Sequence, residues 1–291
     1  MLSAAKSLIE DRWATSAISN IAVLMGKEVR DSQRNRWFLM FAVVFTGLAL
    51  GLSLLGFSGL GTFGVAGFGR TVASLINLVV VITPLMGLLL GAISISGERE
   101  RGSLLPLLAQ PVTPTEVLLG KFFGTAASLA AAILLGFGLS GIVIAWHGGL
   151  AQLGDYLMLV GLTLLLGLVH LGIGFCLSAV ISKSTTALSV ALILWLSIVF
   201  LSDLGLIGTA IVLRLSPQTL LGLALLNPAQ VFKLAAIQMI QGNLELLGAA
   251  GLYAADVFGD FLLPVLMALL TLWILIPLGI AIGMFPRKGI Q

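Results

Sequence analysis

The amino-acid sequence predicts an all-α polytopic membrane protein with six transmembrane helices, and three observations support this prediction. Hydrophobic residues make up 59% of the 291 residues and charged residues only 9%, whereas soluble domains are roughly 45–50% apolar and about 25% charged. The mean hydropathy is +1.14. Six segments approach the length of about 20 apolar residues that a helix needs to cross a bilayer. A chain with so little polar surface cannot cover a water-soluble globule.

The predicted spans form a single transmembrane domain, 37–291, which follows a cytoplasmic N-terminal segment, 1–36. We expect the spans at 37–57, 73–96, 114–145, 156–181, 186–208 and 261–285. The fifth span is ambiguous, because its apolar run stops at Leu201 unless the helix continues through Asp203.

The basic residues predict the orientation. With both termini in the cytoplasm, 12 of the 15 Lys and Arg residues fall on the inner side, and Arg70, Arg214 and Lys233 fall on the outer side. Short cytoplasmic loops carry an excess of Lys and Arg, so we expect both termini to be cytoplasmic. Lys6 and Arg12 interrupt the N-terminal segment, which therefore does not resemble a cleavable signal peptide.

The segment before the first span predicts an amphipathic helix over 16–36 that lies along the inner membrane surface as an elbow. Its apolar residues recur at three- and four-residue spacing, at Ile18, Ile21, Met25 and Val29. The charged residues on its other faces include Lys27, Glu28, Arg30, Arg34 and Arg36. The alternative is a solvated basic flank that only anchors the topology.

The sequence of segment 97–121 predicts a folded element, with a turn and short helical parts, on the cytoplasmic face. It begins with four consecutive charges, Glu98 to Arg101, which we expect to form a stub that projects from the bilayer, with Glu98 and Arg101 paired on one helix face. Gly102 permits a turn, and an apolar patch with Leu104 and Leu105 follows before Pro111.

The same segment ends in a helix start. Thr113 at the N-cap, Pro114 at the first helical position and Glu116 three residues after the cap match a capping box with a proline start. The third span is therefore expected to begin at Pro114 and to run through Lys121 before it enters lipid. A docking element for a soluble partner is the preferred interpretation, and a plain structured loop is the alternative.

The outer region, 209–260, is apolar but broken by Pro217, Pro228 and several glycines, so we expect short helices packed at the outer surface. Two further spans are the alternative. If the fifth span continues, Asp203 becomes an intramembrane carboxylate, which predicts a role along a translocation path or at an outer gate. The alternative for Asp203 is a membrane-edge residue bonded to backbone.

Motifs for catalysis are missing from the sequence. P-loop, HExxH and GxSxG patterns are absent, so we expect no catalytic residue. His170 and the single cysteine, Cys176, are six residues apart and point in different directions on a helix, which argues against a shared metal site. His170 is expected to be hydrogen-bonded or to face a cavity, and it is a second candidate for a translocation path.

Three segments together make the whole chain similar to an ABC-2 type transporter permease: GKEVRDSQRNRW at 26–37, GERERGSLLPLLAQPVTPTEVLLGKFFG at 97–124 and LLNPAQVFKL at 225–234. The middle segment is the most specific. The resemblance implies a coupling helix between spans two and three that docks in a groove of an ABC ATPase subunit. The residues assigned to this coupling are Glu98, Arg99, Glu100, Arg101, Gly102, Leu104, Leu105, Pro111, Thr113, Pro114, Glu116 and Lys121.

The resemblance also implies the partners. The chain would form a homodimer with two copies of the ATPase subunit, in the inner or plasma membrane of a bacterial or archaeal cell. ATP and Mg would bind to the ATPase, with no cofactor or metal on this chain, and the expected contacts are membrane lipid and protein but not nucleic acid.

Within the family, the segments at 26–37 and 225–234 and the run SDLGLIG resemble permeases that serve assembly of the copper–sulfur centres of nitrous oxide reductase. That likeness implies a NosD-like periplasmic solenoid protein as an outer partner. A generic exporter of lipid, drug or peptide, and a membrane scaffold without transport, are the alternatives.

Overall fold

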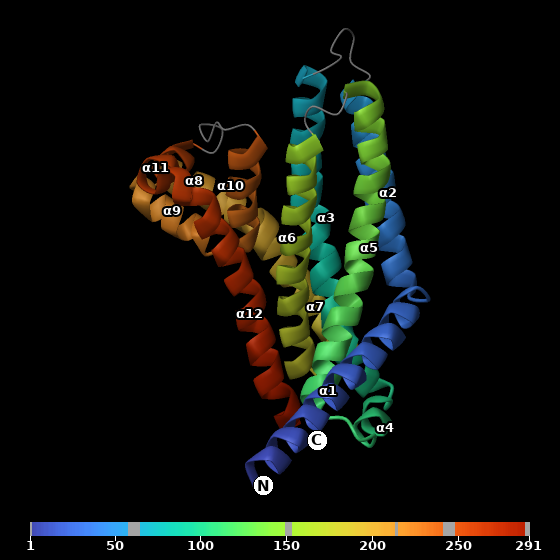
Figure 1. Cartoon of the computed structure of the whole chain (residues 1–291). Coiled ribbons are helices and arrows are strands. Elements are labelled where there is room, and N and C mark those ends of the chain that lie inside the picture. The colour runs from blue at the N-terminus through green and yellow to red at the C-terminus, as the bar shows by residue number, and fades with distance from the viewer. Residues whose placement is uncertain (1, 58–64, 149–152, 213–214, 241–247, 289–291) are drawn as a thin grey trace.

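A computed structural model describes residues 2–57, 65–148, 153–212, 215–240 and 248–288, and every regular element in these ranges is a helix (Figure 1). The longer helices are α1 (Leu2–Ser32), α2 (Arg36–Phe57), α3 (Val65–Glu100), α5 (Pro114–Gly148), α6 (Leu153–Val180), α7 (Ser184–Leu196), α8 (Ser202–Val212), α10 (Pro228–Ile240), α11 (Gly248–Phe258) and α12 (Leu262–Lys288). The shorter helices are α4 (Leu104–Leu108) and α9 (Pro217–Leu225).

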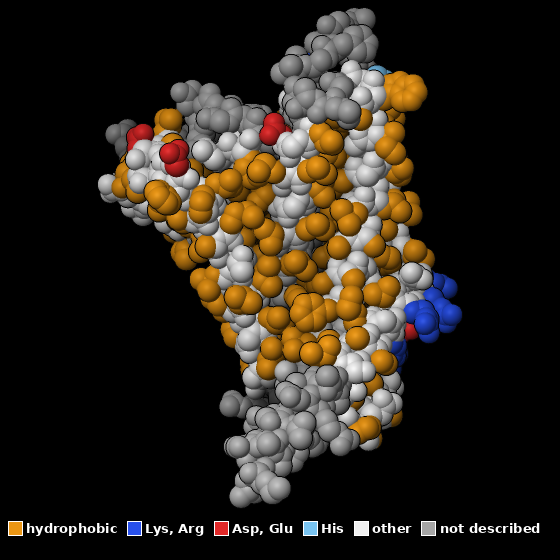
Figure 2. Space-filling model, in the orientation of Figure 1, with side chains coloured by type: hydrophobic (Ala, Val, Ile, Leu, Met, Phe, Trp, Pro, Cys, Tyr) orange, Lys and Arg blue, Asp and Glu red, His pale blue; other side chains and the backbone are white. Residues whose placement is uncertain are grey.

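Six candidate membrane spans are present among the described residues, as the sequence predicts. They are Arg36–Gly56, Gly69–Glu100, Pro114–His147, Leu153–Val180, Ser184–Leu206 and Ala250–Phe285. Hydrophobic side chains cover the middle of the face drawn in Figure 2, while Lys and Arg gather at the right edge of its lower half and most of the visible Asp and Glu lie in its upper part. This distribution matches a belt of lipid-facing surface.

The ambiguity over the fifth span is resolved by a turn of π-helix. Ser197–Leu201 joins α7 to α8 without a break, so the span continues past Leu201 and contains Asp203. The elbow helix also begins far earlier than predicted, because α1 runs from Leu2 rather than from residue 16.

The α3–α6 contact forms the centre of the bundle. A Cβ added to Gly91 would lie 2.6 Å from the carbonyl oxygen of Leu171, and one added to Gly174 would lie 2.6 Å from that of Leu88. These distances are shorter than any real Cβ contact, so the two backbones touch because glycine stands at both positions. This close approach holds α3 in the core.

Two polar contacts fix the depth of α3 relative to its neighbours. The Ser178 hydroxyl oxygen on α6 accepts from the backbone N–H groups of Ile95 and Ser96 at 2.9 and 2.8 Å. The Trp195 indole on α7 donates to the carbonyl oxygen of Val81 at 2.9 Å. Both contacts satisfy groups for which no water is available inside a membrane.

The region between the fifth and sixth spans forms short helices, as predicted, but one of them lies deeper than expected. α9 and α10 meet at an angle of 110°. α10 packs against α6 and α12, and Val231, Phe232 and Ala235 on it are fully buried. Residues 213–214 and 241–247 of the predicted outer region lie outside the described residues.

The glycine contact gives a stability prediction with a matched control. Gly91→Ala should lower the free energy of unfolding by about 1–3 kcal/mol, because the added methyl group overpacks the α3–α6 interface. Gly47→Ala, on α2, places its methyl group in open space, so it should be neutral or stabilising through helix propensity. Thermal unfolding in detergent measures both variants; equal midpoints for the two would contradict the assignment.

Candidate functional site

The end of α3 is a Schellman motif centred on Gly102. The Ser103 N–H donates to the carbonyl of Glu98 at 3.0 Å, and the Gly102 N–H donates to that of Arg99 at 3.1 Å. Gly102 has a φ of 71°, a left-handed conformation that glycine adopts without steric cost. The turn predicted at this glycine is therefore present, and it directs the chain into α4.

The start of α5 is the predicted capping box. The Glu116 N–H donates to the Thr113 hydroxyl oxygen at 3.3 Å, and the Thr113 N–H donates to the Glu116 carboxylate at 3.2 Å. The helix begins at Pro114. The connection between spans two and three is therefore α4 held between two capped helix ends.

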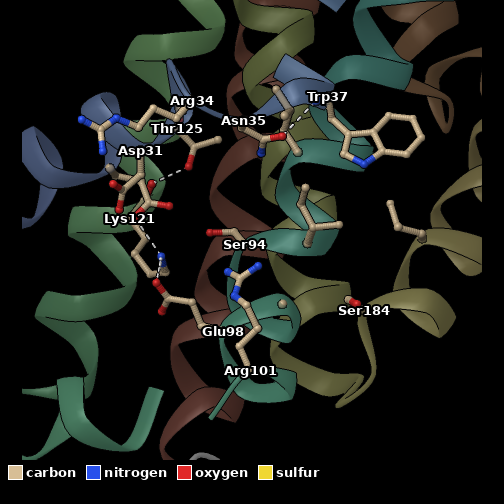
Figure 3. A pocket seen from close by; sticks show the side chains of 16 residues that line it. Asp31, Arg34, Asn35, Trp37, Ser94, Glu98, Arg101, Lys121, Thr125 and Ser184 are labelled. Atoms are coloured by element: carbon tan, nitrogen blue, oxygen red, sulfur yellow. Dashed lines mark hydrogen bonds and ion pairs between the residues drawn. The ribbon is translucent and has the colours of Figure 1, made fainter. Parts of the chain in front are cut away.

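Two charged residues that flank this connection, Glu98 before it and Lys121 after it, point inward. Lys121 is only 2% exposed, and its ammonium group donates to Glu28 at 2.8 Å and to Glu98 at 3.0 Å. Lys27 adds a weaker contact to Glu98 at 3.8 Å. Figure 3 shows Lys121 reaching toward Glu98 inside the protein. We call Glu28, Glu98 and Lys121 the Lys121 cluster.

The Lys121 cluster joins three helices, because Glu28 lies on α1, Glu98 on α3 and Lys121 on α5. Charge-assisted hydrogen bonds are stronger than neutral ones, and a buried charge is costly when left alone. Glycines let α1 approach α5: a Cβ on Gly120 or Gly124 would lie 2.5 Å from the Cβ of Leu24 or Glu28. The three helix ends are therefore tied into one body.

The predicted pairing of Glu98 with Arg101 is wrong. Glu98 faces the interior and is already held by Lys121, while Arg101 is exposed beyond the last turn of α3. The expectation of a projecting charged stub is wrong for Glu98, which is buried, and for Arg99, whereas Glu100 and Arg101 are exposed. Arg99 is half-buried and donates to the carbonyl of Ile181, and Glu100 accepts from the backbone of Ser184 at 3.1 Å. Both residues bind the neighbouring α6–α7 connection.

The predicted elbow residues occupy two faces of α1 and its junction with α2. Glu28 faces α5, while Lys27, Arg30, Arg34 and Arg36 are exposed. On the apolar side, Leu24 is buried and Ile18 is 68% exposed. α1 therefore packs on α5 through Leu24 and Glu28, and the predicted apolar residues Ile21, Met25 and Val29 are half-buried beside this contact.

The solvent-facing part of the connection is α4 and its flanks. Leu104 and Leu107 are buried beneath it, and Leu105 is 65% exposed. We define the α4 face as the exposed residues Leu105, Pro106, Gln110, Pro111 and Thr113. Of the predicted coupling residues, Leu105, Pro111 and Thr113 are exposed on this face, and Glu100, Arg101 and Gly102 are exposed beside it, at the end of α3.

Asp203 belongs to a polar cluster that the sequence analysis did not identify. Lys233 on α10 donates to its two carboxylate oxygens at 2.8 and 2.6 Å, and Gln230 donates to the same carboxylate. Asn227 donates to the Ile198 carbonyl in the π-turn at 2.7 Å. The available signal was the charged Lys233 within the apolar run LLNPAQVFKL, since an intramembrane acid requires a partner.

His170 lies apart from this cluster, in the α3–α6 interface. It is fully buried, and its Nδ1 lies 2.8 Å from the carbonyl of Leu166. A Cβ on Gly87 would lie 3.0 Å from the His170 Cβ, so the ring packs against α3. Among the described residues no three His, Cys, Asp or Glu side chains gather at metal-binding distance.

The Lys121 cluster predicts a large effect of one substitution. Lys121→Met should lower the free energy of unfolding by about 3–5 kcal/mol, because it leaves two carboxylates buried beside each other. Combining it with Glu28→Gln and Glu98→Gln should recover much of the loss. Lys27→Met, at a lysine with a side chain 49% exposed, should change the free energy by under about 1 kcal/mol. Equilibrium unfolding in mixed SDS micelles compares them; similar losses for Lys121→Met and Lys27→Met would refute the cluster.

Comparison with known proteins agrees with this architecture. Residues 22–290 match the family described as ABC-2 family transporter protein. A probable ABC transporter permease protein NosY from Stutzerimonas stutzeri is 34% identical over 270 residues, which cover 90% of this chain and 96% of that protein. The protein with the same description from Pseudomonas aeruginosa is 36% identical over 274 residues, covering 91% and 97%. The chain is therefore a multi-pass membrane protein of the ABC-2 transporter permease family, similar to the NosY permeases.

Proposed function

We propose that this chain is the membrane subunit that couples ATP hydrolysis on a partner ATPase to movement across the inner membrane. In this proposal two copies of the chain form a homodimer and each binds one ATPase through the α4 face. The observation that carries the proposal is the geometry of α4, a short helix with an exposed Leu105 held between two capped helix ends.

The distribution of charge supports the orientation. Lys27, Arg30, Arg34 and Arg36 lie on α1 and its junction with α2, at the end of the bundle that carries α4 (Figure 1). Because basic residues favour the cytoplasmic side, this end and both termini would face the cytoplasm. The α4 face would then stand where a soluble ATPase can reach it.

The mechanism follows from how α4 is attached. The Schellman motif fixes α4 to α3, and the capping box fixes the other end of the loop to α5. The Lys121 cluster joins α3 and α5 to α1, so displacement of α4 by a closing ATPase would move three helices together. This chain transmits the movement of the ATPase to its helices, while ATP and Mg remain on the partner.

The biological role in this proposal is assembly of the copper–sulfur centres of nitrous oxide reductase. Its support is the similarity to NosY permeases together with the segment LLNPAQVFKL, which resembles the same permeases. In this segment Asn227 binds the π-turn and Lys233 binds Asp203 on α8. This end of the molecule, formed by α8–α11, would receive a NosD-like solenoid protein. A generic ABC-2 exporter would share the α4 face but not this role.

The test expresses a tagged Leu105→Glu variant in a host strain from which the gene for this protein has been deleted. A charge on the α4 face should reduce the ATPase that co-purifies with the tagged chain by about tenfold, because it removes an apolar contact and adds an unpaired carboxylate at the interface. Leu153→Glu is the control, since Leu153 is 44% exposed on α6 at the opposite end. Mass spectrometry identifies and quantifies the co-purified ATPase.

The same strains test the biological role. Wild type and Leu153→Glu should restore the copper–sulfur centres of nitrous oxide reductase, measured by absorption spectroscopy, and Leu105→Glu should not. ATPase binding that survives Leu105→Glu would refute docking at the α4 face. Normal reductase centres in the strain without the chain would refute the role while leaving a general exporter in place.

A further inference from the structure

A cavity of about 450 Å³ lies beside the Lys121 cluster (Figure 3). Its volume falls in the range of roughly 300–1,000 Å³ that is typical of small-molecule sites. Its walls come from α1, α2, α3, α5 and α7, so five helices contribute to one enclosure. The lining includes Asp31, Arg34, Trp37, Ser94, Glu98 and Arg101.

The cavity lies at the level where apolar helices begin. Arg36 and Ser184 are the first residues of the spans on α2 and α7. Trp37, half-exposed at the rim, is a residue type enriched at membrane–water interfaces. Leu90 and Leu188 supply apolar lining. A ligand here would meet charge on one side and hydrocarbon on the other.

Three acids (Glu28, Asp31 and Glu98) and four cations (Lys27, Lys121, Arg34 and Arg101) lie in or beside the cavity, which leaves one net positive charge. Each acid has a lysine partner: Glu28 and Glu98 bind Lys121, and Asp31 lies 3.9 Å from Lys27. Arg34 and Arg101 make no ion pair with an acid in the part of the chain that the structure describes. Guanidinium groups bind phosphate through paired N–H donors, so the surplus favours a phosphate ligand.

Two buried polar atoms in the cavity wall also lack partners. Ser94 is 9% exposed, and neither its hydroxyl oxygen nor the Oε2 of Glu98 has a hydrogen-bond partner among the described residues. Figure 3 shows Ser94 and Glu98 flanking the space into which Arg101 reaches. Buried polar atoms are nearly always hydrogen-bonded. A ligand that accepts from Ser94 and donates to Glu98 would satisfy both.

We propose that this cavity binds the headgroup of a glycerophospholipid from the leaflet at the α4 end of the bundle. The phosphate lies against Arg101 and the Ser94 hydroxyl, with Arg34 as the second cation at the rim. An N–H or O–H group of the headgroup alcohol donates to Glu98, and the acyl chains leave past Trp37 and Leu188. Ethanolamine and glycerol headgroups carry such a donor, whereas choline carries none.

The first test compares headgroups on the purified full chain. Dihexanoyl phosphatidylethanolamine, phosphatidylglycerol and phosphatidylcholine are titrated in detergent, and the thermal unfolding midpoint reports binding. The ethanolamine and glycerol lipids should half-saturate the shift at a concentration about tenfold or more below that of the choline lipid, because only they satisfy Glu98. Equal responses to all three would overturn the headgroup assignment.

Variants locate the site. Ser94→Ala should weaken binding of the ethanolamine lipid by about two- to tenfold without lowering the lipid-free midpoint, because its hydroxyl has no partner to lose among the described residues. Arg101→Gln should weaken binding by about tenfold or more. Arg30→Gln is the matched control, since Arg30 is exposed on α1 and does not line the cavity.

Two results would contradict the proposal outright. If the Ser94→Ala and Arg101→Gln variants bind lipid as tightly as the Arg30→Gln control, the lipid binds somewhere else on the protein. Soluble O-phosphoethanolamine that shifts the midpoint at the same concentration as its dihexanoyl lipid would show a site for free phosphate compounds and not for lipid. Neither readout requires the ATPase, so the outcome is independent of the function proposed above.

Discussion

The structure depends on one buried ammonium group. Lys121 lies between two carboxylates, Glu28 and Glu98, that come from different helices. Glu98 and Lys121 are buried and Glu28 is partly buried, and a buried charge that loses its partner is costly. Each of the three helices therefore needs the other two at this point, close to the loop that carries α4.

This constraint explains why the α4 loop is built as it is. A five-residue helix has little stability alone, but its two attachments lie on helices that the cluster holds at a fixed spacing. Gly102 turns the chain away from α3, and the capping box restarts it at Pro114. The result is a small exposed surface on a rigid base. The adjoining cavity, with its two arginines, lies against the same base.

Local signals in the sequence were sufficient for much of this architecture. Apolar length predicted the six spans, and the pattern from Thr113 to Glu116 predicted the start of α5, because a capping box involves neighbours only. Which way the charged side chains point could not be predicted from neighbouring residues, because their partners lie far away in the sequence. Glu28 and Lys121 are 93 residues apart, and Lys233 and Asp203 are 30 apart. Nothing in the spacing of Glu98 to Arg101 distinguishes a helix face that packs inward from one that meets water. Spacing alone therefore predicts Arg101 as the partner of Glu98, whereas the structure pairs Glu98 with Lys121.

The central claim is that α1, α3 and α5 move as one body when the transporter works. Double electron–electron resonance tests it most directly, with spin labels at Ile18 on α1 and Asn77 on α3, both exposed, after Cys176, the single cysteine, is replaced by serine. With the labelled chain diluted in unlabelled chain, so that most transporters carry one labelled copy, the account predicts the same distance distribution in the nucleotide-free and ATP-trapped transporter. A shift of several ångströms, or a second population on ATP binding, would contradict it.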